Sequence, residues 1–241
     1  MKKLGHLGVY TLLVFLSVYL PELGVVHLTK FLGWGIDGYS IISLVWELVL
    51  VVLFVFWLKK KEMLYIFEKK GSNKSRFFYL LFGLVATCFV RQLVDTFQIQ
   101  YHYLVDNKYI FQDLLSVLYS NGQPTFLSTV LSFSLTVVVA PISEELIDRG
   151  YFMNTFFHQS KYYLDVILSA LIFGISHLIL THRDPISLII YSFVGLFFAL
   201  VYRWTKNLTI TILCHSFFNF LIYAKPIWIF VYNYVYYHFF R

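Results

Sequence analysis

Repeated apolar runs of about 20 residues limit the fold of this chain more than any other feature. A helix that crosses a bilayer needs about 20 apolar residues, and Tyr39–Leu58 carries a single charged residue, Glu47. Charged residues make up only 13% of the chain, against about 25% in an average soluble domain. The pattern therefore predicts an all-α, polytopic membrane protein.

We expect about eight transmembrane helices. Their approximate ranges are 7–28, 39–58, 77–96, 125–158, 164–181, 186–202, 207–224 and 227–240. Residues 97–124 mix polar and aromatic side chains, which is typical of a loop with a helix at the membrane surface. An isolated carboxylate inside a span, such as Glu47, should be protonated or paired, and Arg91 and Arg149 are its candidate partners.

Lysine and arginine residues are divided unevenly between the two sides of the predicted spans. With the N-terminus inside, thirteen lie inside, including seven between Lys59 and Arg76, and four lie outside. Cytoplasmic loops are rich in these residues, so we expect a multi-pass protein of the cell membrane with both termini in the cytoplasm. Because the positive residues fall in loops, the net charge of +6 requires no nucleic-acid partner.

A cluster of charges directly follows the uncharged run 126–140. Four ionisable residues lie within six positions: Glu144, Glu145, Asp148 and Arg149. Each costs roughly 2.5–3.5 kcal/mol at the bilayer centre, so the cluster indicates a functional site with internal partners. On an α-helix Glu145 shares a face with Arg149, which can neutralise its charge. Glu144 points away from that face and stays available for a functional role. The alternative is that Pro141 ends the helix and places these charges at the lipid headgroups.

Polar residues on two later spans reach a similar depth. Glu144 and His177 each lie on the order of 24 Å from the turn near Ser160, if the helices are straight. His215 and Asn219 lie on the order of 14 and 20 Å from the next turn on the same side. The sequence therefore predicts a site buried between helices.

Three motifs in this order resemble those of the CPBP intramembrane proteases. They are Glu144-Glu145-x-x-x-Arg149, Phe173-x-x-x-His177 and His215-x-x-x-Asn219. The family includes the type II CAAX prenyl endopeptidases, the Abi proteins and proteins similar to lysostaphin resistance protein A. The resemblance divides the chain into N-terminal transmembrane helices and loops (1–124), a catalytic core (125–225) and a C-terminal transmembrane segment (226–241). Asp148 departs from the family pattern, which usually has an apolar residue there.

The resemblance implies hydrolysis of peptide bonds by a glutamate-activated water. Glu144 would be the general base, and His177 would orient the water. His215 and Asn219 would stabilise the oxyanion, supported by the Glu145–Arg149 pair. Structural roles remain open. Asn219 could serve simply to cross-link helices, and Arg149 could extend to the headgroups.

We expect no cofactor. The alternative is a zinc ion with Glu144, His177 and His215 as its ligands. The expected partners are membrane lipids and a membrane-associated peptide or protein substrate. CAAX-type processing and bacteriocin maturation or immunity are the candidate roles. Two other classes fit the same spans: a non-catalytic membrane scaffold or bacteriocin immunity protein, and a proton-coupled transporter that uses membrane glutamates and histidines as a relay.

Overall fold

The structure is a computed structural model that describes residues 2–67, 72–100, 125–157, 159–178 and 185–239. Within these ranges every regular element is a helix, so the predicted all-α class is confirmed. The predicted surface helix within 97–124 lies almost wholly outside the described residues.

The N-terminal part consists of a bent helix and two long helices. Helix α1 (Lys2–Val14) continues through π-helical turns at Phe15–Tyr19 and Pro21–Val25 into α2 (Val26–Leu32), with a bend of 50°. Pro21 has no N–H to donate to the preceding turn, which accounts for a break at this point. Helix α3 (Gly35–Lys60) and helix α4 (Asn73–Gln100) follow, and a short 3-10 helix (Leu64–Phe67) lies between them.

The central helix carries the charge cluster. It comprises α6 (Phe126–Ser134), a π-helical turn (Leu135–Val139), α7 (Ala140–Glu145), a second π-helical segment (Leu146–Met153) and α8 (Asn154–Phe156). Together they form one apolar 31-residue helix that is long enough to cross a membrane. The helix does not end at Pro141, so the alternative that places Glu144 at the headgroups is wrong.

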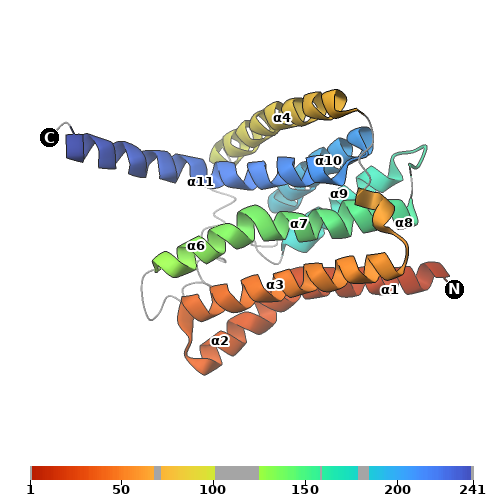
Figure 1. The fold of residues 1–241 in the computed structure, drawn as a ribbon, viewed down its shortest axis with the longest axis horizontal. Helices are drawn as coiled ribbons and strands as arrows, with labels where there is room; N and C mark the ends of the chain where they lie inside the picture. The colour runs from red at the N-terminus through yellow and green to blue at the C-terminus, as the bar shows by residue number, and fades with distance from the viewer. Residues whose placement is uncertain (1, 68–71, 101–124, 158, 179–184, 240–241) are drawn as a thin grey trace.

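The C-terminal part consists of α9 (Leu164–His177), α10 (Pro185–Thr205) and α11 (Leu208–Phe239). Two separate spans were expected in place of α11, with a break near Pro226, but the helix is continuous. Membrane helices can accommodate proline where other groups satisfy the freed backbone. In consequence the start of α1 and the end of α11 lie at opposite ends of the bundle (Figure 1), and the placement of both termini in the cytoplasm stays a prediction.

The predicted count of eight spans is not confirmed. Among the described residues four helices are long and apolar enough to cross a membrane, or five if the bent α1–α2 pair is one span. Helix α9 and the Leu208–Ala224 part of α11 are apolar but shorter than 18 residues.

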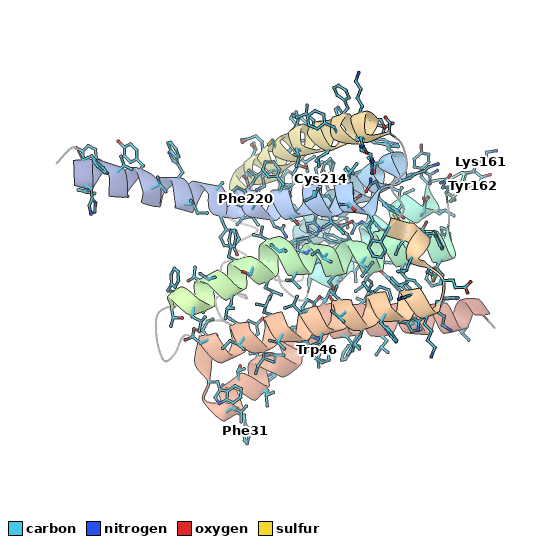
Figure 2. The ribbon with its side chains drawn as sticks, viewed as in Figure 1. Phe31, Trp46, Lys161, Tyr162, Cys214 and Phe220 are labelled. Carbon is cyan, nitrogen blue, oxygen red and sulfur yellow. The ribbon has the colours of Figure 1, made fainter. Side chains whose placement is uncertain are left out.

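The central helix lies between two groups of helices. Figure 1 shows α1, α2 and α3 on one side of it and α10 and α11 on the other. Helices α9 and α10 make the closest pair, because glycines remove the side chains between them. A Cβ at Gly195 would lie 2.9 Å from Phe173 Cβ, and one at Gly174 would lie 3.0 Å from Leu188 O. Figure 2 shows Lys161 and Tyr162 at one end of the bundle and Phe31 at the other.

Candidate active site

The first group of the site is a buried ion pair on the central helix. Arg149 Nη1 lies 3.2 Å from Glu145 Oε1 and 3.6 Å from Asp148 Oδ2. Arg149 Nη2 donates to Gly195 O at 2.9 Å, and its guanidinium lies over the Phe173 ring at 4.8 Å. The side chains of Glu145 and Arg149 are 0% exposed, so Arg149 does not extend to the headgroups. The predicted i,i+4 pairing is present even though this segment is π-helical.

Glu144 faces two histidines from two other helices. Its Oε2 atom lies 3.9 Å from His177 Nε2 at the end of α9 and 3.8 Å from His215 Nε2 on α11. The Glu144 side chain keeps 18% of its surface exposed, whereas that of Glu145 keeps none. The two adjacent glutamates therefore occupy different surroundings, as their spacing on a helix predicts.

The other ring nitrogen of each histidine has a fixed partner. His177 Nδ1 lies 2.8 Å from Phe173 O, and a carbonyl oxygen can only accept, so Nδ1 is the donor. His215 Nδ1 lies 2.8 Å from Glu145 Oε1 and donates to that carboxylate. In the neutral rings Nε2 is then an acceptor on both histidines. Three acceptor atoms therefore face one another: two Nε2 atoms and Glu144 Oε2.

Aromatic rings hold both imidazoles in place. Tyr191 stacks on His177 with a centroid distance of 4.7 Å, and Phe198 stacks on His215 at 4.3 Å. Phe173, the aromatic residue of the second motif, lies 4.3 Å from His177 on another side. Sequence reasoning missed Tyr191 and Phe198, which both lie on α10. The available signal was the close packing of α10 on α9 predicted by small residues four apart, such as Gly195 and Ala199.

Asn219 lies on the same helix as His215 and contacts the central helix. Its Nδ2 donates to Thr136 O at 2.9 Å. Thr136 belongs to the π-helical turn before Pro141, in which Ala140 N–H donates to Leu135 O. In the same π register the N–H of residue 141 would donate to Thr136 O, but proline has no N–H. Asn219 thus satisfies a carbonyl that Pro141 leaves without a backbone donor, and it keeps one N–H for other use.

Helix α1 and the π-helical turn that follows it supply partners for two carboxylates. Asp148 Oδ1 accepts a hydrogen bond from Tyr10 OH at 2.7 Å, so the residue that departs from the family pattern has its own donor. Glu47 Oε1 accepts from Ser17 Oγ at 2.5 Å. Glu47 is paired as expected, but neither predicted arginine is its partner. Arg149 is engaged as described, and Arg91 pairs with Asp95 on α4.

The predicted zinc ligands are close to one another without forming a ready cage. Within the described part of the chain no three His, Cys, Asp or Glu side chains are arranged to hold a metal ion. His215 and His177 each face Glu144 at nearly 4 Å. In this arrangement the three side chains do not form a zinc site.

Comparison with known proteins gives a consistent result. Residues 126–221 match the profile of the family described as Type II CAAX prenyl endopeptidase Rce1-like. An "Uncharacterized protein" of Mycoplasma capricolum subsp. capricolum is 34% identical over 109 residues, which is 45% of this chain and 31% of that protein. The "Putative membrane peptidase YdiL" of Bacillus subtilis is 30% identical over 89 residues, which is 37% of this chain and 34% of that protein. No solved structure matches the chain.

The helices and the family match define a multi-pass membrane protein. The comparisons support the resemblance to the CPBP family, because the matched residues 126–221 contain all three of its motifs. The matched part of the chain spans about a third of the length of the two curated relatives. Substrate, mechanism and site roles are therefore matters of proposal.

Proposed function

We propose that this chain is an intramembrane endopeptidase in which Glu144 activates a water for attack on a peptide bond. One observation carries the proposal: Glu144 Oε2 faces two histidine Nε2 atoms, at 3.9 Å for His177 and 3.8 Å for His215. These gaps are too long for a direct hydrogen bond, and a water beside the three atoms would satisfy them. A water has two hydrogens, so it can donate to two of these three acceptor atoms at once.

The reaction follows from this arrangement. Glu144 takes a proton from the water while the water oxygen bonds to the scissile carbonyl carbon, and the carbonyl π electrons move to oxygen. The protonated Glu144 then delivers its proton to the amide nitrogen as the C–N bond breaks. His177 orients the water, because its ring is fixed by Phe173 O and by the stacked Tyr191.

The oxyanion needs hydrogen-bond donors on the opposite side of the carbonyl. In the neutral ring His215 Nε2 accepts from the water, and once the ring is protonated the same atom donates to the oxyanion while Nδ1 stays bonded to Glu145. Asn219 has one N–H beyond its bond to Thr136 O. We assign these two side chains to oxyanion stabilisation, worth a factor of about 10²–10³ for one donor in comparable sites.

The substrate class follows from the location of the site. A site between apolar helices accepts a peptide or protein that is itself associated with the membrane, so CAAX-type processing and bacteriocin maturation or immunity both stay within the proposal. The positive-inside rule favours a cytoplasmic location for the end of the bundle that holds the N-terminus, Lys59–Lys61 and Lys161.

A cleavage assay on a peptide library tests the function. We expect the purified wild-type protein to cleave some members, and Glu144→Gln to cleave them at least 10²-fold more slowly. We also expect cleavage to persist after dialysis against a chelator. Loss on dialysis with recovery on adding Zn²⁺ would replace the metal-free mechanism with a metal-dependent one. No cleavage by wild type, together with ion transport in vesicles, would favour the transporter.

A further inference from the structure

A polar stripe lies on the buried face of α3, outside the part of the chain that matches the family. Its residues are Ser40, Ser43 and Glu47, which are 2%, 1% and 4% exposed. The same face continues with three apolar residues at the same helical spacing: Leu50, Phe54 and Leu58. The stripe is therefore polar from the start of α3 to its middle and apolar from there to Lys59.

Polar groups on neighbouring helices face this stripe. Ser40 Oγ lies 3.3 Å from Ser132 Oγ on α6. Glu47 Oε1 accepts from Ser17 Oγ at 2.5 Å, and Ser17 Oγ lies 3.0 Å from Ser143 Oγ. Ser143 directly precedes Glu144 in α7. The stripe thus leads over a rise of about 10 Å along α3 to the residue next to the proposed base.

Two buried atoms of the stripe have no hydrogen-bond partner among the described residues: Ser43 Oγ and Glu47 Oε2. Leaving a buried polar group unpaired costs about 1–3 kcal/mol, so native proteins rarely do so. A water commonly satisfies such groups where several polar atoms surround one space. The end of the stripe nearest the start of α3 is also followed by polar groups, because the exposed Thr125 donates to Asp37 there.

We infer that Ser40, Ser43 and Glu47 line a hydrated path that supplies water to Glu144 from the end of the bundle where α3 begins. The inference rests on the proposed function, because hydrolysis consumes one water for each peptide bond and the site lies between apolar helices. The apolar half of the stripe closes the path toward Lys59. Glu47 and Ser17 pass the water to Ser143 and do not touch the substrate.

Cysteine reactivity tests the path without using proteolysis as the readout. A water-borne methanethiosulfonate ammonium reagent modifies thiolates, which form only in contact with water. We expect Ser43→Cys to react at least tenfold faster than Leu50→Cys, which lies on the same face in the apolar half. Mass spectrometry of the α3 peptide separates this label from any on Cys88 or Cys214. Equal rates at the two positions in folded protein would overturn the inference. The serines would then only pack α3 against its neighbours, without water between them.

A second measurement addresses catalysis. We expect Glu47→Leu to lower kcat at least tenfold with little change in KM. Glu47→Gln should retain most of kcat, because the glutamine side chain keeps the path hydrated. Wild-type kcat in Glu47→Leu would contradict the path. The labelling result stands even if no peptide is cleaved, so failure of the path and failure of the protease assignment are distinguishable.

Discussion

Replacing Glu145 with glutamine removes the main countercharge of Arg149. The two side chains are fully buried with Nη1 and Oε1 3.2 Å apart. Breaking a buried pair by removing one partner costs about 3–5 kcal/mol. We expect the lower end, because Asp148 Oδ2 remains 3.6 Å from the same guanidinium. In a chain of this size 1 kcal/mol corresponds to about 2–4 °C, so the melting temperature should fall by about 6–12 °C.

The matched control is the neighbouring residue. Glu144 has no arginine or lysine within ion-pair distance in the described structure, and its charged-group contacts are histidines at 3.8 and 3.9 Å. Glu144→Gln keeps the shape of the side chain, so the melting temperature should stay close to that of wild type. Its cleavage rate should fall by a factor of about 10²–10⁴, as expected when a general base is lost.

The assay is a thermal melt in detergent beside a cleavage measurement on the same samples. Glu145→Gln should lose stability and activity together, and Glu144→Gln should lose activity alone. Equal melting temperatures for Glu145→Gln and wild type would refute the assignment of Glu145 as the essential countercharge. Full activity in Glu144→Gln would refute its assignment as the base.

Three further predictions concern the supporting structure. Tyr10→Phe removes the donor to Asp148 at 2.7 Å, and we expect a loss of about 1–3 kcal/mol, measured as a lower melting temperature. Gly195→Ala places a Cβ within 3.1 Å of three atoms of α9 and should cost about 1–3 kcal/mol, whereas Gly5→Ala meets nothing within 4 Å and should cost nothing; similar melting temperatures would contradict the packing. A cysteine at Lys60 should resist membrane-impermeant labels on intact cells and react after permeabilisation; labelling from outside would reverse the orientation.

The sequence was sufficient to predict the cluster of site residues. The four residues assigned to catalysis carry polar groups in apolar helices. Rise per residue placed Glu144 and His177 about 24 Å, and His215 about 14 Å, from turns on the same side, which was close enough to predict that they meet, while their catalytic roles stay predictions. The central helix was also predicted as one element, over 125–158. These predictions rest on properties of single helices, which the sequence encodes directly.

Contacts between helices could not be predicted in the same way. Nothing in the pattern around Tyr10 or Ser17 shows that α1 and the following π-helical turn supply hydroxyls to Asp148 and Glu47. The predicted partners of Glu47 were chosen by charge, but a buried carboxylate is also satisfied by hydroxyl donors. The single helix α11 was missed because Pro226 was taken as a break, and a proline within a membrane helix does not always end it.

Asn219 has two candidate roles, and they make different predictions for one pair of substitutions. Its Nδ2 donates to Thr136 O, which Pro141 leaves without a backbone donor. Asn219→Ala should therefore cost about 1 kcal/mol or more in stability. Pro141→Ala restores a backbone N–H, which serves Thr136 O directly in the π register or through Ala140 in the α register. The cost of Asn219→Ala should then shrink by about 1 kcal/mol in the Pro141→Ala background.

Cleavage by the same four proteins separates the roles. If Asn219 acts only by joining α11 to the central helix, the double variant should recover activity together with its melting temperature. If its second N–H also stabilises the oxyanion, as we propose, activity should stay low by a factor of about 10²–10³ although stability recovers. Parallel recovery of both quantities would remove Asn219 from the oxyanion site. Equal stability costs in the two backgrounds would show that the Thr136 carbonyl does not depend on it.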